Sequence, residues 1–236
     1  MPTKTLIIIP AYNEELSIAS VIKEVRGLKA GYDIVVVDDG SSDRTAEEAK
    51  RAGAGVLQLP INLGIGGAMQ TGFRYAVRRD YDCAVQVDGD GQHPANEIPR
   101  LVSVIAAGGA DVAIGSRFLE KKGFQSTFSR RLGIRYFQFL HQVLARVRIT
   151  DSTSGFRALG RRALAMVDGT YPDEFPESES IVLFALGGLK IREVPVVMRG
   201  RQGGESSIRR LISLYYMFKV TLAIIFTYFR HRKGRI

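Results

Sequence analysis

Short, largely apolar runs recur along the first half of the chain, and each of the first four is followed by a stretch with helical periodicity. The runs cover Thr5–Ile9, Ile34–Val37, Gly55–Leu59, Ala84–Val87 and Val112–Ile114. This spacing is typical of successive βαβ units. Because the runs are largely apolar rather than alternating, we expect parallel strands covered on both faces. The first 116 residues therefore predict a doubly wound α/β sheet, whose ligands bind at the carboxyl ends of the strands.

In the second half of the chain, the regular alternation of apolar runs and helical stretches ends. It predicts a basic, aromatic helix over 130–148, an acidic turn over 172–179, a helix over 180–186 and a strand over 190–196. No linker rich in Gly, Pro and Ser separates the halves, so we expect one domain over residues 1–208.

The C-terminal segment 209–236 stands apart by its charge pattern. Leu211–Phe229 carries a single charge, Lys219, and basic residues flank it on both sides. A bilayer-spanning helix needs about 20 apolar residues, so the length is marginal for a span. Basic and aromatic residues also suit a helix lying in the headgroup region. We expect a membrane-associated helix, with a buried core helix as the alternative.

Charge and cysteine content narrow the choice of partners. The net charge is +9, but residues 117–148 and 201–236 each contribute +7, so the remainder is mildly acidic. Such basic zones favour anionic partners such as phosphates or an acidic membrane surface. Nucleic-acid binding is not expected, because no recognition motif accompanies them. The single cysteine, Cys83, excludes an internal disulfide framework and favours a reducing, cytosolic setting.

The strongest candidate for chemistry is the segment Asp88-Gly89-Asp90-Gly91-Gln92-His93-Pro94, directly after an apolar run. Two carboxylates on an extended, glycine-rich segment can share Mg²⁺ or Mn²⁺, whose remaining positions are filled by water and phosphate oxygens. The alternative is an Asp-Gly turn. An EF-hand is excluded because Pro99 occupies its twelfth position. His93 could be a ligand or a loop residue.

Two other segments should reach the same edge of the sheet. Pro10–Glu15 and Asp38–Ser41 each end a predicted strand and carry carboxylates, which suit hydrogen bonding to a base or ribose. Adjacent carboxylates at 38 and 39 repel each other unless something binds there. Asn62–Ala68 could let backbone approach an anion, but it lacks the GxGxxG pattern and no P-loop occurs.

Three further segments pair an arginine with small hydroxyl residues, as phosphate sites do. They are 115–117, 151–157 and 201–206. Each alone could be a solvated loop, and their co-occurrence with a cation site favours function.

Taken together and in this order, these motifs closely resemble glycosyltransferase family 2, over residues 4–208. The last three segments resemble its polyprenyl-phosphate sugar transferase branch. The resemblance implies a GT-A fold and an inverting transfer of a sugar from a nucleotide-sugar donor to a polyprenyl phosphate. It also implies a location on the cytoplasmic side of the cell membrane. Because the apolar segment Leu211–Phe229 is marginal for a span, we also expect a small membrane protein, or a second copy of the chain, as a further partner.

The resemblance also implies roles for individual residues. The residues expected to bind the donor are Pro10, Ala11, Tyr12, Glu14, Asp39 and Asp88. Those expected to bind the metal, Mg²⁺ or Mn²⁺, are Asp90, Gln92 and Asp88. Those expected to bind the acceptor phosphate or the donor diphosphate are Arg117, Ser154, Arg157 and Arg201. Asp88, Arg117 and Arg201 are expected to be catalytic. Gly91-Gln92 differs from a pair often found in mannose synthases, which favours UDP over GDP-mannose as donor.

Two acceptors remain open. A phosphate is already ionised near neutral pH, so it needs no general base. A saccharide hydroxyl of a growing polysaccharide would need a carboxylate base, for which Glu177, Glu179 and Asp173 are candidates. We favour reading these acids as a solvated turn and helix start.

Overall fold

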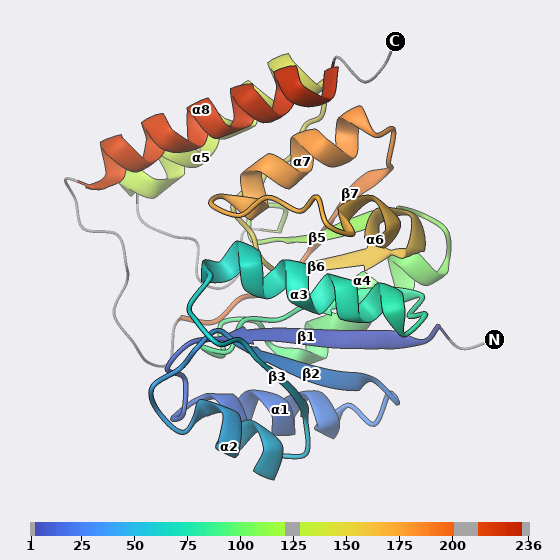
Figure 1. The fold of residues 1–236 in the computed structure, drawn as a ribbon. Helices are drawn as coiled ribbons and strands as arrows, with labels where there is room; N and C mark the ends of the chain where they lie inside the picture. Colours follow the sequence, from blue (N-terminus) through green and yellow to red (C-terminus); the bar gives the residue numbers. More distant parts are fainter. Residues whose placement is uncertain (1–2, 121–127, 201–211, 233–236) are drawn as a thin grey trace.

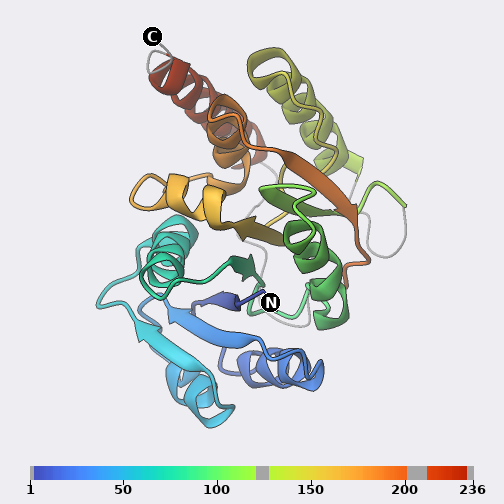
Figure 2. The same ribbon diagram turned by 90° about the vertical axis from the view of Figure 1, so that its right-hand side faces the viewer.

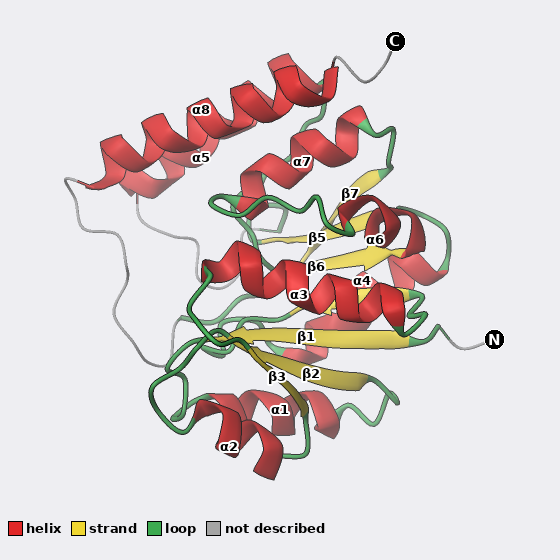
Figure 3. Cartoon of the chain, viewed as in Figure 1, coloured by secondary structure: helices red, strands yellow, loops and turns green. Residues whose placement is uncertain are grey.

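A seven-stranded sheet forms the centre of the protein (Figures 1 and 3). The computed structural model describes residues 3–120, 128–200 and 212–232. The strand order is β3-β2-β1-β4-β6-β5-β7. The strands are β1 (Thr5–Ala11), β2 (Asp33–Asp38), β3 (Gly55–Gln58), β4 (Cys83–Gln86), β5 (Val112–Ser116), β6 (Arg157–Gly160) and β7 (Ile191–Pro195). The five strands predicted in the first half are therefore confirmed.

Strand β6 was not expected from the sequence. It lies antiparallel between β4 and β5, whereas β1 to β4 are parallel to one another and β5 is parallel to β7. Its first residue, Arg157, is opposite Gln86 of β4 and Ile114 of β5. The polar segment before β6 is thereby brought to the carboxyl ends of both neighbouring strands.

Helices cover both faces of the sheet (Figures 1 and 2). Their bounds are α1 (Ile18–Gly27), α2 (Thr45–Arg51), α3 (Gly64–Arg78), η1 (Ala95–Glu97), α4 (Ile98–Ala106), α5 (Phe128–Ala145), α6 (Arg161–Val167), α7 (Pro176–Leu186) and α8 (Ile212–Arg232). Alternate residues of β1 serve the two cores: Ile7 and Ile9 pack with α1 and α4, and Leu6 and Ile8 pack with α3, α6 and α7. Burial on both faces explains why β1 is apolar at almost every position.

Helices α5 and α8 form an outer layer over α7 (Figure 2). Phe137 of α5, Val182 of α7 and Val220 and Ile224 of α8 share a small buried cluster. Helix α7 begins at Pro176, so the predicted acidic turn is in part the first turn of a helix. Proline is favoured there because its missing N–H needs no partner in the first turn. Among the helices that the structure describes, none has the length and hydropathy needed to cross a bilayer.

Candidate active site

The loops after β1 and β2 are joined by hydrogen bonds between side chains and backbone. The Asn13 N–H donates to Ser41 Oγ (3.0 Å), and the Ser42 N–H donates to Asn13 Oδ1 (2.9 Å). The Glu14 N–H donates to Thr45 Oγ1 (2.8 Å). Asn13 has a positive φ of 54°, a conformation that asparagine tolerates better than most residues. The two predicted donor-binding segments are therefore held as one unit.

Asp39 lies at the junction of three loops. Its N–H donates to the Ala11 carbonyl (2.9 Å), and its Oδ1 accepts the Leu63 N–H (2.8 Å). The side chain is only 4% exposed. Burial raises the pKa of Asp39 above its ordinary value, although the backbone N–H groups of Leu63 and Gly64 oppose the shift. The loop at 62–64 thus supports the carboxylate predicted to meet the nucleoside.

Asp38 has an internal partner, which the sequence did not reveal. Its Oδ1 accepts the Ser41 N–H (3.1 Å), so this carboxylate stabilises the turn after β2. Each of the adjacent carboxylates at 38 and 39 accepts a backbone hydrogen bond, and the charge of Asp38 still raises the pKa of Asp39.

The loop after β4 packs directly against the end of β1. A Cβ atom at Gly89 would lie 3.3 Å from the Pro10 carbonyl oxygen and 3.7 Å from both Ala11 Cβ and Glu14 Cγ. Since the Ala11 carbonyl also accepts the Asp39 N–H, one segment of β1 touches both acidic loops. The structure therefore brings the predicted donor and cation segments together at one edge of the sheet, as the strand pattern predicted.

Asp90 and Gln92 bind each other within this loop. Asp90 Oδ1 accepts the Gln92 N–H (3.0 Å) and Oδ2 accepts Gln92 Nε2 (2.7 Å). Gly91 between them has a φ of +77°, which favours glycine. Asp90 is 6% exposed and Asp88 is half-buried. The loop thus presents two carboxylates and an amide on a tight, preformed turn.

The chemistry of these groups fits a small, hard divalent cation. Within the described part of the chain, no group of three or more His, Cys, Asp or Glu side chains could enclose a metal by itself. Mg²⁺ commonly binds through one or two carboxylates and takes its other oxygens from water and phosphates. Asp88, Asp90 and Gln92 match that kind of open site, which a diphosphate would complete.

Arg117 forms a buried, two-pronged ion pair with Asp151. Its Nε and Nη2 donate to the two carboxylate oxygens at 2.7 Å each, and its backbone N–H donates to Oδ2 at 3.2 Å. Arg117 is 5% exposed and Asp151 is fully buried. The orientation of this predicted phosphate ligand is therefore fixed by the loop that precedes β6.

Arg157 ties the same loop to α7. Its guanidinium donates four hydrogen bonds, to the carbonyls of Ser152, Ser154 and Glu177 and to Ser180 Oγ, at 2.7 to 3.2 Å. Arg157 and Ser154 are almost fully buried, and Ser154 Oγ accepts the Phe156 N–H (3.3 Å). In this geometry Arg157 and Ser154 shape the loop around the site.

Glu193 of β7 was not identified as a site residue. Its Oε1 accepts Thr150 Oγ1 and the Asp151 N–H, and its Oε2 accepts the Thr150 N–H, all at 2.8 Å. One carboxylate thereby holds the residue that orients Arg117. The available signal was the one acid in the strand predicted over 190–196, at the position before Val194-Pro195.

The remaining predicted residues lie at the margin of this region or outside the described residues. Tyr12 is half exposed at the end of β1. Arg201 lies outside the described residues, although the Arg199 N–H just before it donates to the Gln92 carbonyl (3.0 Å). Arg199 therefore lies beside the cation loop.

The acidic residues near the start of α7 differ from one another. Glu177 is half-buried, and burial raises its pKa, while Arg157 lowers it and the charge of Asp88 adds to the increase. Glu179 faces α8, where its Oε2 accepts Thr227 Oγ1 (2.8 Å). The predicted helix start is confirmed, because Glu177 and Glu179 lie in the first turn of α7, but Glu177 is half-buried and not solvated.

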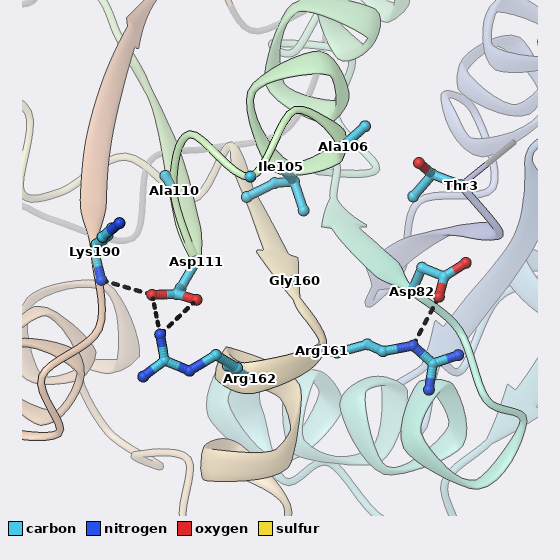
Figure 4. Close-up of a pocket in the computed structure, with 11 residues that line it drawn as sticks. Thr3, Asp82, Ile105, Ala106, Ala110, Asp111, Gly160, Arg161, Arg162 and Lys190 are labelled. Atoms are coloured by element: carbon cyan, nitrogen blue, oxygen red, sulfur yellow. Dashed lines mark hydrogen bonds and ion pairs between the residues drawn. The ribbon is translucent and has the colours of Figure 1, made fainter. Parts of the chain in front are cut away.

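A hollow of about 560 Å³ lies at the opposite edge of the sheet (Figure 4). Arg161 and Arg162 point to opposite sides of it, where Arg161 binds Asp82 (2.7 Å) and Arg162 binds Asp111 (3.1 Å). These pairs tie the start of α6 to the starts of β4 and β5. None of the predicted site residues lines the hollow, so it is separate from the candidate active site.

The seven-stranded sheet with its acidic carboxyl edge has the fold of GT-A glycosyltransferases. Glucosyl-3-phosphoglycerate synthase of Mycobacterium tuberculosis, solved with Mn²⁺, UDP-glucose and phosphoglyceric acid, superposes with a TM-score of 0.69 over 96% of this chain and 80% of that chain. At 21% identity this likeness speaks for the fold alone. The family model of glycosyl transferase family 2 matches residues 6–167. The chain belongs to that family.

Sequence relatives lie in the polyprenyl-phosphate branch of the family. Polyprenol monophosphomannose synthase of Mycolicibacterium smegmatis is 33% identical over 227 residues, which cover 92% of this chain and 85% of that relative. UDP-N-acetylglucosamine–dolichyl-phosphate N-acetylglucosaminyltransferase of Methanococcus voltae is 31% identical over 211 residues, covering 80% and 83%. These relatives confirm the predicted family and branch.

Proposed function

We propose that this protein transfers a sugar from a UDP-sugar to a polyprenyl phosphate at the cytoplasmic face of a membrane, with inversion at the anomeric carbon. The observation that carries the proposal is the meeting of the loops after β1, β2 and β4 at one edge of the sheet. Pro10, Ala11, Tyr12, Glu14 and Asp39 would hold the nucleoside. The relatives named above act on lipid phosphates, and the solved neighbour binds UDP-glucose with Mn²⁺.

Asp88, Asp90 and Gln92 would hold Mg²⁺ or Mn²⁺ at the diphosphate. A cation bound there would neutralise the charge that grows on the departing nucleoside diphosphate. Asp151 pairs with Arg117, and Glu193 holds Asp151, so the orientation of the Arg117 guanidinium is fixed. A preorganised hydrogen-bond donor needs no rearrangement during the reaction, which is where electrostatic catalysis gains its effect. We propose Arg201 as a further phosphate ligand.

The reaction needs no general base when the acceptor is a phosphate. A phosphate oxygen, already ionised near neutral pH, attacks the anomeric carbon from the face opposite the diphosphate. The new carbon–oxygen bond forms as the bond to the diphosphate breaks, and UDP leaves with the electron pair. Ser154 and Arg157 shape the loop that would receive the acceptor phosphate.

A saccharide hydroxyl is the second candidate acceptor, and Glu177 is the observation that favours it. This carboxyl is half-buried, interacts electrostatically with Asp88, and has a raised pKa. Those properties suit a general base. Replacing Glu177 by Gln separates the two acceptors: turnover with a polyprenyl phosphate should persist, whereas a hydroxyl acceptor would require the carboxylate.

We propose that residues 1–208 form the catalytic domain and that α8, within 209–236, associates with the membrane. Apolar side chains lie exposed along one face of α8, at the helical spacing of three and four residues: Tyr215, Phe218, Leu222, Phe226 and Phe229. Phe218 and Phe226 are 62% and 68% exposed, and Arg230 and Arg232 follow at the end of the helix. Aromatic side chains with nearby cations suit a lipid headgroup interface.

The membrane assignment is tested by sedimentation with vesicles that contain anionic lipid. Phe226→Ser should lower the bound fraction without changing the melting temperature, because its side chain is exposed. Leu16→Ser, at a residue 95% exposed on the other side of the sheet, is the control. Equal loss of binding in both variants would contradict the assignment. A small membrane protein or a second copy on this face remains a prediction.

The catalytic assignment is tested in two steps. Thermal stabilisation by UDP and GDP, each with and without Mn²⁺, reveals the nucleotide, since a ligand raises the melting temperature only when it binds the folded state. Labelled UDP-sugars and undecaprenyl phosphate should then give a product that partitions into organic solvent. Asp90→Asn should lose both the Mn²⁺-dependent stabilisation and the transfer. Asp168→Asn, at an exposed carboxylate paired with Arg74, is the matched control.

Transfer by wild-type protein only to soluble saccharides would overturn the proposed acceptor. Stabilisation by neither nucleotide would overturn the proposed function as a whole.

A further inference from the structure

His93 is enclosed between two loops of the candidate site. The ring is 6% exposed. On one side its Nδ1 accepts the Asp88 N–H (3.0 Å), and on the other it stacks on the ring of Phe156, with centroids 4.7 Å apart and planes 12° apart. The residue therefore touches both the cation loop and the loop that precedes β6.

The hydrogen bond determines which ring nitrogen carries the proton. Because Nδ1 accepts the Asp88 N–H, the proton of the neutral ring lies on Nε2. Nε2 lies 3.6 Å from Asp88 Oδ2. The ring thus meets Asp88 twice, at its backbone and at its carboxylate.

Phe156, on which His93 stacks, also packs against the segment that contains Gly115. Its ring is fully buried, and a Cβ atom at Gly115 would lie 3.0 Å from Phe156 Cδ1. A Cβ atom at the neighbouring Gly155 would lie 3.4 Å from Asp88 Oδ1. Phe156 therefore packs between His93 and the segment that ends in Arg117.

We propose that His93 is a positioning residue that couples the Asp88 carboxylate to the loop at 151–157, and through it to Arg117. This inference rests on the proposed function, in which the Asp88 loop holds the donor diphosphate and the loop at 151–157 receives the acceptor phosphate. The stacked ring fixes the distance between the two sides. The hydrogen bond to the Asp88 N–H fixes the cation loop against that ring.

Three substitutions separate the parts of this contact. His93→Phe keeps a flat ring against Phe156 but leaves the Asp88 N–H without its acceptor. His93→Asn keeps an acceptor near the Nδ1 position but loses the stacking. Phe156→Leu keeps the histidine and loses its partner ring. Phe73→Leu is the matched control, because Phe73 is also fully buried in an aromatic pair, with Tyr171, outside the candidate site.

The first measurement is binding of UDP with Mn²⁺ by calorimetry. We expect affinity to fall about tenfold in His93→Phe, as for the loss of a hydrogen bond to a buried N–H, and less in His93→Asn. Phe73→Leu should lower the melting temperature and leave affinity within about twofold of wild type. In turnover, His93→Phe and Phe156→Leu should lower kcat more than they raise KM.

The second measurement is the side-chain ¹⁵N spectrum of the histidines without ligand. His93 should show an unprotonated Nδ1 and a protonated Nε2. Exchange between tautomers, or a protonated Nδ1, would overturn the proposal. So would wild-type affinity in both His93→Phe and Phe156→Leu, or an equal loss in Phe73→Leu. If wild-type protein binds neither UDP nor GDP with Mn²⁺, the proposed function falls and this inference falls with it.

Discussion

Replacing Glu193 by Gln tests how much of the site depends on the one carboxylate of β7 that holds Thr150 and Asp151. The carboxylate accepts three hydrogen bonds, two at Oε1 and one at Oε2, all 2.8 Å long. Glutamine supplies one acceptor oxygen. If that oxygen takes the Oε1 position, the amide nitrogen faces the Thr150 N–H, and two donors oppose each other. A hydrogen bond to a charged group contributes about 1.5–3 kcal/mol, and an orphaned donor adds to the loss.

We therefore expect Glu193→Gln to lower the free energy of unfolding by about 2–4 kcal/mol. For a chain of this size, each kcal/mol shifts the melting temperature by roughly 2–4 °C, which gives a decrease of about 4–16 °C. Thermal unfolding followed by circular dichroism at neutral pH, without ligand, measures this shift. Transfer activity should fall further than stability requires, because Asp151 orients Arg117.

The matched control is Glu47→Gln, at an exposed carboxylate whose ion pair with Arg51 is 3.8 Å long. Exposed pairs of this kind contribute little, so its melting temperature should stay near that of wild type. A shift in Glu193→Gln no larger than in this control would refute the reasoning, since the three hydrogen bonds would then contribute nothing net.

Three further changes have defined outcomes. Gly155→Ala places a methyl group 2.8 Å from Gln86 Nε2 and 3.4 Å from Asp88 Oδ1. We expect Mn²⁺-dependent nucleotide binding, measured by calorimetry, to weaken at least tenfold. Unchanged binding would refute this prediction. Arg157→Lys cannot restore four buried hydrogen bonds, and urea unfolding should show a loss of about 3–5 kcal/mol; a loss below about 1 kcal/mol would contradict this. Burial lowers the pKa of His141, so stability should be full above the ordinary histidine pKa and decline as pH falls below it. His141→Gln should remove that decline, which is at most about 1.4 kcal/mol per pH unit; identical pH profiles for the two proteins would exclude His141 as its source.

The acidic loops after β1, β2 and β4 were predictable from the sequence, whereas the supporting contacts made by β6 and β7 were not. Apolar strands that end in acidic, glycine-containing loops indicate where those loops lie, so the strand pattern alone predicted that the loops carrying Asp39 and Asp88 would both lie beside the end of β1. Strand β6 gave no such signal, because Arg157–Gly160 is four residues long and lacks β-branched side chains. The support by Glu193 and the stack on Phe156 depend on where β6 and β7 join the sheet. Those are long-range pairings that local pattern does not encode.

Strand β6 also separates the synthesis of the protein into two phases. Strands β1 to β4 find all their mutual partners within the first 86 residues, but β5 has no neighbour until β6 follows it some forty residues later. Until then β4 and β5 each present an open edge, which is the kind of surface that recruits strands from other chains. Nascent chains halted between residues 116 and 157 should therefore be the most dependent on chaperones.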